Sequence, residues 1–253
     1  MKAPQATTTI LAICAAISSA LALAQQPPDV VVSDGNENTA MGTGALQSVT
    51  PNSCLYCGIE NTAAGYEALY YDTAGGGNVA MGFLAMEFNE TGHNNTAVGD
   101  EALQHNSGGY YNTAFGSGAV HENLSAFYNT GIGLNALFHN TSGADNTALG
   151  AYALTSSTLS IENTAVGYQT LFTDTSGAYN TASGSQAMYA NTTGYQNTAS
   201  GYQALYGNTL GNHNTVAGFQ ALFSNSNGNS NTAAGDQALY YNTTGYHNTV
   251  LGA

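Results

Sequence analysis

The chain has 253 residues and a single basic side chain, Lys2, against 15 carboxylates, which gives a formal net charge of −14. Nucleic acids and anionic lipids are bound through cations that this chain lacks, so we expect neither as a partner. At 43% hydrophobic residues, the composition is too apolar for a generally disordered chain.

The first 24 residues have the pattern of an export signal. Lys2 precedes an apolar stretch from Ile10 to Leu23, and Ala22-Leu23-Ala24 fits a small-residue cleavage site. A membrane-spanning helix is the alternative, which the shortness of this stretch disfavours. We therefore predict a signal peptide at 1–24 and an N-terminal linker at 25–37. The mature chain is expected to be secreted, extracellular or at the cell surface, without inserting directly into a membrane.

From residue 38 onward, the chain repeats the motif Asn-Thr-Ala-x-Gly. The motif begins thirteen times, and after a first step of 23 residues every later step is 17 residues. The longer first step indicates a six-residue loop insertion near 49–57. A period of 17 is too short for paired-helix repeats and fits one coil of a β-solenoid. We predict an all-β, single-chain β-solenoid (β-roll) of about thirteen coils over residues 38–253.

Each column of the repeat has its own character when positions are counted from the first Asn. Position 1 is always Asn, position 5 is always Gly and position 9 is always aliphatic. We predict that position 9 forms the core and that the position-1 amides form a structural ladder between coils, without a catalytic role. The ladder would consist of Asn38, Asn61, Asn78, Asn95, Asn112, Asn129, Asn146, Asn163, Asn180, Asn197, Asn214, Asn231 and Asn248.

Position 12 is nearly always Asn or Asp and position 15 is nearly always Gly. Both residue types accept positive φ, so these positions indicate turns. Each unit is therefore predicted to form a short strand, a turn, a second short strand and a second turn. Aromatic residues gather at positions 6, 10 and 16, where stacking within the solenoid is favoured over carbohydrate binding.

Positions 2 and 4 are predicted to face outward, because alternation along a strand separates them from the small residue at position 3. Position 4 varies from Ser183 to Phe115, with the bulky members toward the N-terminal half, and a close-packed interior would not accept such volume changes. We expect a flat, partly apolar surface that meets a partner. The candidate interaction face consists of Thr96, Val98, Thr113, Phe115, Thr130, Ile132, Thr147 and Leu149.

Residues that could carry chemistry are few. Cys54 and Cys57 are predicted to form a disulfide after export, because a redox pair or a zinc site would need a context that is absent here. The acidic residues form no column, unlike those of calcium-binding β-rolls, which leaves only an isolated calcium ion as an option. The six histidines are scattered, and no nucleophile motif occurs. We expect no enzyme activity and no cofactor.

The run from Asn95 to Leu103, Asn-Thr-Ala-Val-Gly-Asp-Glu-Ala-Leu, resembles the YadA-like head repeats of trimeric autotransporter adhesins. The resemblance covers residues 38–253. It implies a left-handed β-roll, association into trimers, display at a bacterial surface and adhesion to host matrix or cells. The unit here is longer than is usual in that family, and neither a heptad stalk nor an anchor barrel occurs in the sequence.

The sequence as a whole predicts an adhesin-like or extracellular structural rod that associates with itself and binds surfaces or matrix. It stops one strand into a new unit, so we expect either a longer natural protein or an end covered by another chain, as in head-to-tail filaments. The partners expected are further copies of the chain and a host-matrix or cell-surface ligand. The alternatives are ice- or crystal-surface binding by the regular Thr column and a carbohydrate-active protein on a solenoid scaffold.

Overall fold

The computed structural model describes residues 32–33, 37–48 and 58–252, and within them it is all-β with no helix. One three-residue strand recurs in each unit. The strands are β1 (Val32–Ser33), β2 (Thr39–Met41), β3 (Thr62–Ala64), β4 (Val79–Met81), β5 (Thr96–Val98), β6 (Thr113–Phe115), β7 (Thr130–Ile132), β8 (Thr147–Leu149), β9 (Thr164–Val166), β10 (Thr181–Ser183), β11 (Thr198–Ser200), β12 (Thr215–Ala217), β13 (Thr232–Ala234) and β14 (Thr249–Leu251). The predicted β-solenoid of 17-residue coils is confirmed.

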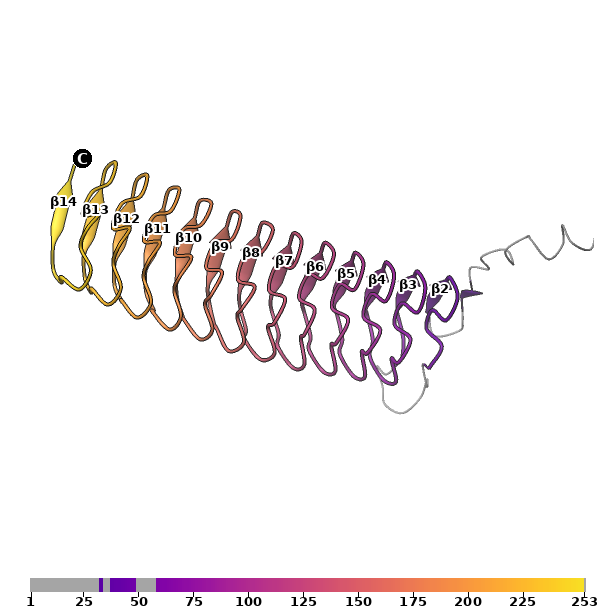
Figure 1. Cartoon of the computed structure of the whole chain (residues 1–253). Coiled ribbons are helices and arrows are strands. Elements are labelled where there is room, and N and C mark those ends of the chain that lie inside the picture. The colour runs from indigo at the N-terminus through magenta and orange to yellow at the C-terminus, as the bar shows by residue number, and fades with distance from the viewer. Residues whose placement is uncertain (1–31, 34–36, 49–57, 253) are drawn as a thin grey trace, which may run out of the picture.

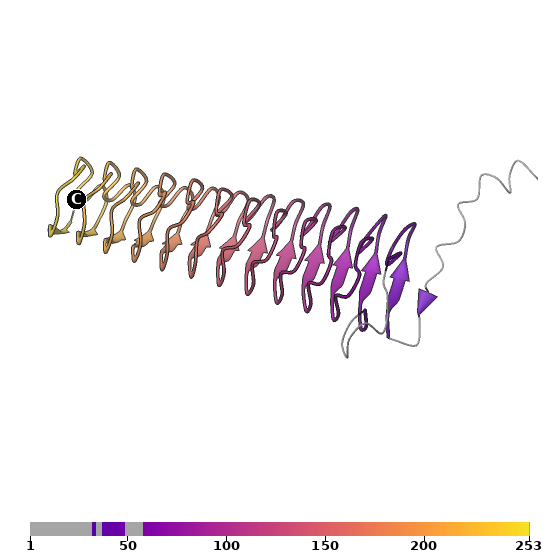
Figure 2. The same ribbon diagram turned by 90° about the horizontal axis from the view of Figure 1, so that it is seen from below.

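Strands β2 to β14 form one parallel sheet in chain order, and the coils stack into a rod (Figure 1). Neighbouring strands pair in register, so that Thr198 lies beside Thr215 and Ala199 lies beside Val216. Seen from below, the sheet follows the rod from one end to the other (Figure 2). Thirteen coils at a strand spacing of about 4.8 Å give a rod about 60 Å long.

The N-terminal end of the sheet has a different arrangement. Strand β1 lies within the segment predicted as a linker and pairs antiparallel with β2, with Val32 opposite Ala40 and Ser33 opposite Thr39. It therefore covers the edge of β2 that no coil covers. An exposed strand edge is a site of unwanted pairing, so this strand protects that end of the rod.

The interior is a column of small and aliphatic side chains from positions 3, 8 and 9. In the coil that begins with β5, Ala97, Ala102 and Leu103 are all fully buried, and the same positions are buried in coil after coil. Burial of one Leu side chain contributes about 2 kcal/mol. A single coil buries too little to be stable alone, so stacking must stabilise the rod.

The prediction of a second strand in each unit is wrong. Ala102 and Leu103 are both buried, whereas an extended strand would turn two successive side chains to opposite faces. Positions 7 and 9 instead adopt left-handed backbone conformations, with φ of 55° at Glu101 and 50° at Leu103. Each such non-Gly residue costs about 1–2 kcal/mol. The turn places two adjacent side chains in the core.

Glycine at position 5 is required by backbone conformation and by space. Gly99 has a φ of +142°, and a Cβ added to it would lie 2.5 Å from the carbonyl oxygen of Gly116 in the next coil. No side chain fits at that distance. The invariance of this position follows from the close approach of the coils.

The position-1 asparagines lie in one buried row along the rod. The Oδ1 atom of Asn95 accepts hydrogen bonds from the backbone N–H of Asn112 (2.9 Å) and from its Nδ2 (3.1 Å). Nδ2 of Asn112 also donates to the carbonyl of Ala126, 2.8 Å away in its own coil. Each amide therefore links adjacent coils and also forms a hydrogen bond within its own coil. Each of these hydrogen bonds contributes about 1 kcal/mol net.

A second buried row of amides lies at position 12, where the sequence predicted only a turn with positive φ. Nδ2 of Asn106 donates to Oδ1 of Asn89 (2.7 Å) and to the carbonyl of Gly109 (3.1 Å). That carbonyl also accepts from Asn95. Neither Asn106 nor Gly109 has positive φ. Position 15 is glycine in most coils because an added Cβ, as at Gly109, would lie 2.2 Å from Nδ2 of Asn123.

Several predicted features lie outside the described residues: the signal peptide at 1–24, the inserted loop near 49–57 and the disulfide between Cys54 and Cys57. Within the described part of the chain, no helix is long and apolar enough to cross a membrane.

Candidate functional site

Positions 2 and 4 of strands β2–β14 form a continuous outward surface, which we call the outer strip. In β6, Thr113 and Phe115 face outward while Ala114 between them is fully buried. In register, Thr113 lies beside Thr130 of β7 and Phe115 lies beside Ile132. A column of Thr therefore runs beside a column of variable side chains.

The predicted interaction face is the part of the outer strip on β5 to β8. Phe115 is 56% exposed and Ile132 is 40% exposed, while the other members are partly buried by their neighbours. The structure brings all eight predicted residues onto one surface: Thr96, Val98, Thr113, Phe115, Thr130, Ile132, Thr147 and Leu149. Sequence reasoning did not include position 6, where Phe83 and Leu134 are exposed too.

The outer strip changes character along the rod. In β4 to β9, position 4 is occupied by Met81, Val98, Phe115, Ile132, Leu149 and Val166. In β10 to β13, it is occupied by Ser183, Ser200, Ala217 and Ala234. The first part is bulky and apolar, and the second is flat, with Thr beside a small side chain.

The outer strip is also uncharged. No acidic or basic residue occupies position 2 or 4 in any of the thirteen units. Exposed carboxylates lie elsewhere, as at Glu101 of position 7 and Glu122 of position 11. A second copy of this acidic chain would be repelled by those surfaces, whereas two outer strips can meet without bringing like charges together.

Aromatic rings stack along the rod. At position 10 the longest column contains Phe172, Tyr189, Tyr206, Phe223 and Tyr240, with successive ring centroids 4.9–5.2 Å apart and planes within 8° of parallel. Each inner ring has another ring on both faces. Only ring edges remain for a ligand, so this column stabilises the stack of coils.

Two carboxyl groups replace Asn in the position-12 row, and both are fully buried: Asp72 and Asp174. Asp174 accepts hydrogen bonds from Oγ of Ser160 (2.6 Å), from Nδ2 of Asn191 and from the backbone N–H of Gly177. Burial raises the pKa of both carboxyls to about 7, and the donated hydrogen bonds oppose this rise. The described residues include no Lys or Arg side chain that could compensate the charge.

The position of Asp174 follows from the direction of the row. Most Asn residues of the row donate from Nδ2 to Oδ1 of the preceding coil, as Asn208 does to Asn191; Asn140 does not, and Oδ1 of Asn123 has no hydrogen-bond partner. An ionised carboxyl has no proton with which to donate a hydrogen bond. It therefore fits where the preceding coil has no amide oxygen at position 12 that would need a donor. The preceding coil has Ser157 at position 12, and it has Ser160 at position 15, where most coils have Gly. Asp174 therefore begins a run of the row.

Three histidines at positions 10 and 11 lie near two glutamates. Nδ1 of His139 is 2.7 Å from Oε2 of Glu122, and Nε2 of His121 is 3.8 Å from Oε2 of Glu101. Burial lowers the pKa of His121, and the neighbouring His105 acts in the same direction. Within the described residues, no three His, Cys, Asp or Glu side chains are arranged to hold a metal ion.

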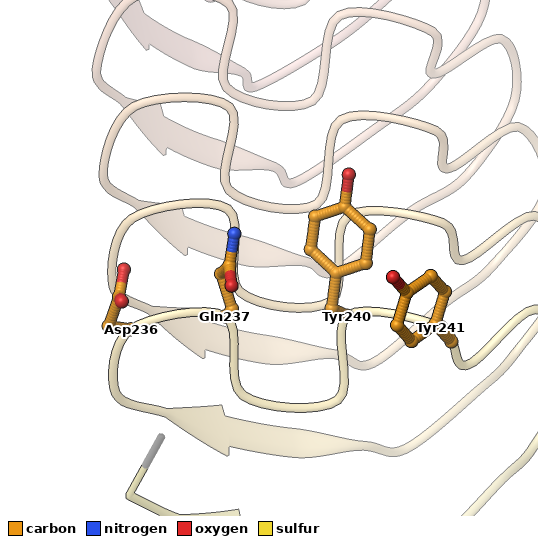
Figure 3. Close-up of a pocket in the computed structure, with 4 residues that line it drawn as sticks. All are labelled: Asp236, Gln237, Tyr240 and Tyr241. Atoms are coloured by element: carbon orange, nitrogen blue, oxygen red, sulfur yellow. The ribbon is translucent and has the colours of Figure 1, made fainter.

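Among the described residues, two of the shallow pockets lie on the side of the rod. One has a volume of about 380 Å³, and Figure 3 shows its lining residues side by side on one coil: Asp236, Gln237, Tyr240 and Tyr241. The other has a volume of about 290 Å³ and is lined by Tyr71, Thr73, Phe88 and Glu90. Each pocket contains one carboxylate, whereas glycoside hydrolysis generally uses a pair.

Comparisons with protein-family models, with curated proteins and with solved structures find no match for this chain. No relative therefore points to a role, and the function is inferred from the chain's own fold and repeat columns.

Proposed function

We propose that the protein is a non-enzymatic, adhesin-like or structural rod that works outside the cell and associates with itself through the outer strip. The observation that carries the proposal is the combination of exposed bulky apolar side chains, as at Met81, Phe115 and Ile132, with the absence of charge from the strip. Exposed apolar strips of this length are typical of surfaces that meet a partner.

The resemblance of the repeat to YadA-like head repeats supports a trimer displayed at a cell surface, with adhesion to matrix or cells as its role. A head-to-tail filament is the other arrangement that fits a rod of stacked coils. In either case the repeat would supply many equivalent contacts along one line, and weak contacts that are repeated add up to strong attachment.

Sedimentation of the purified mature chain tests this proposal. Wild-type protein should sediment as an oligomer, and replacing Phe115 and Ile132 by Ser should dissociate it. The matched control replaces Leu124 and Leu159 by Ser, because these are as exposed (49% and 59%) but lie outside the strip. A monomeric wild type, or equal dissociation of both double variants, would contradict the proposal.

Ice or crystal-surface binding is the second candidate, and one observation favours it. In β10 to β13, the Thr column lies beside side chains no larger than Ser, which makes a flat array with the spacing of the strands. Thermal hysteresis of wild-type protein, and its loss when Thr198 is replaced by Tyr, would support this candidate. For a carbohydrate-active role, the two pockets described above each offer one carboxylate, whereas glycoside hydrolysis generally uses a pair.

A further inference from the structure

Ten tyrosines are more than 40% exposed among the described residues, and two of them are stacked on each other. Tyr111 and Tyr128 occupy position 17 of adjacent coils, with ring centroids 5.3 Å apart and planes within 7° of parallel. They are 49% and 52% exposed. No other two exposed tyrosines in the described part of the chain have stacked rings.

The backbone and the neighbouring rings hold this pair in place. The N–H of Tyr111 donates to the carbonyl of His93, and that of Tyr128 donates to the carbonyl of Tyr110, each at 3.2 Å. Tyr110 packs edge-on against both rings, at 5.8 Å and 5.9 Å, and Phe127 packs edge-on against Tyr128. These contacts keep the two phenols adjacent while one side of each stays in water.

We propose that Tyr111 and Tyr128 form a site of oxidative phenol coupling, which joins two coils of the solenoid by a dityrosine cross-link. The oxidant is hydrogen peroxide, used by a haem peroxidase. Each phenol O–H loses one electron and one proton, and a carbon–carbon bond forms between one Cε atom of each ring. The ring protons at those carbons move to the oxygens, which restores both phenols, and one peroxide is reduced to two water molecules.

The composition of the chain favours this chemistry over other cross-links. Lys2 is the only lysine, so bonds that need lysine amines cannot form within the repeats. The chain contains no Trp, so no indole competes with the phenols as an electron donor. The cross-link would staple adjacent coils where no internal Lys or Arg salt bridge exists, and it does not require association between copies.

Peptide mapping after oxidation tests the proposal. Dilute purified protein is treated with a haem peroxidase and hydrogen peroxide, then denatured and digested with a glutamyl endopeptidase. Cleavage after Glu101, Glu122 and Glu162 places the two tyrosines on separate fragments, 102–122 and 123–162. We expect these fragments to remain joined, with a mass lower by two hydrogen atoms. Dityrosine fluorescence should be found in the single denatured chain, before digestion.

Two single variants make the test specific. Tyr111→Phe keeps the stacked ring and should abolish the joined fragments, while circular dichroism stays unchanged. Tyr179→Phe removes an equally exposed phenol from the same column position and should leave them intact. Undiminished joining in Tyr111→Phe, equal loss in both variants, coupling only between molecules, or coupling at Tyr189 and Tyr206 in place of this pair would each overturn the proposal.

Discussion

The buried Asp174 makes the stability of the rod depend on pH. Its pKa is about 7 in the folded chain against an ordinary value of 3.8, so the folded state retains a proton that the unfolded state loses. A rise of about 3 pKa units corresponds to about 4 kcal/mol. Because the pKa is raised, this stabilisation is fully present below pH 4, declines as the pH rises toward 7 and is lost above it.

Urea unfolding between pH 4 and pH 8 measures this effect. Wild-type protein should be more stable at pH 4 than at pH 8, with Asp72 contributing in the same direction. In Asp174→Asn, Oδ1 can still accept from Asn191, and Nδ2 can donate to the Ser160 hydroxyl. This variant should therefore be more stable than wild type at pH 8, and its dependence on pH should fall by about 4 kcal/mol.

A control separates this effect from general repulsion among the carboxylates, which also weakens the rod as the pH rises. Asp145→Asn removes the same charge from an exposed position, so it should change the pH dependence only slightly. Equal effects of the two substitutions, or a wild type whose stability does not fall between pH 4 and pH 8, would show that the buried Asp174 carboxyl does not set this pH dependence.

Three further predictions concern the packing of the coils. Gly150→Ala should destabilise the rod by several kcal/mol, because the new Cβ would lie 2.4 Å from the carbonyl oxygen of Gly167 in the next coil, at a φ of +139°. As a control, Gly108→Ala would bring its Cβ no closer than 3.4 Å to Thr91 and should change the urea midpoint little. Asn146→Ala removes two side-chain donations and two acceptances in the buried row and should cost on the order of 3 kcal/mol, measured in the same way. Ser157→Asn should destabilise the rod at pH 8, because its Oδ1 would face the Asp174 carboxylate, which cannot donate a hydrogen bond; the loss should be smaller in the Asp174→Asn background, where Nδ2 can donate, and additive effects in this double-mutant cycle would contradict the interpretation.

Much of this architecture could be predicted because the same residue types recur at the same positions in thirteen units. The fixed step of 17 residues indicates a stacked coil, and an aliphatic residue at every position 9 marks the core. Position 4 could be placed outside because Phe115 and Ser183 cannot share one packed environment. These inferences use patterns of residue type, which the sequence displays directly.

Other features depend on backbone geometry that residue types do not display. Leu103 has a positive φ, which the intrinsic preference of Leu would not predict. The stacking of the coils imposes this conformation. Asn106 has the residue type of a turn position. Its place in a buried row of amides follows only from its hydrogen bond to Asn89, 17 residues earlier in the chain. The signal was present in the uniformity of position 12, but Asn is common in turns as well.

Each residue of the rod lies beside its copy 17 positions away, and cysteine cross-linking gives the sharpest test of this stacking. In protein with Cys54 and Cys57 replaced by Ser, Thr198 and Thr215 are changed to Cys in one variant, and Thr198 and Thr232 in another. Thr198 and Thr215 are paired on adjacent strands, while Thr232 lies one strand further on. A disulfide needs Cα atoms within about 7 Å, and two strand spacings exceed that distance. The first variant should form an intramolecular disulfide and the second should not; cross-linking of the second variant alone, or of neither, would mean that the coils do not stack in this register.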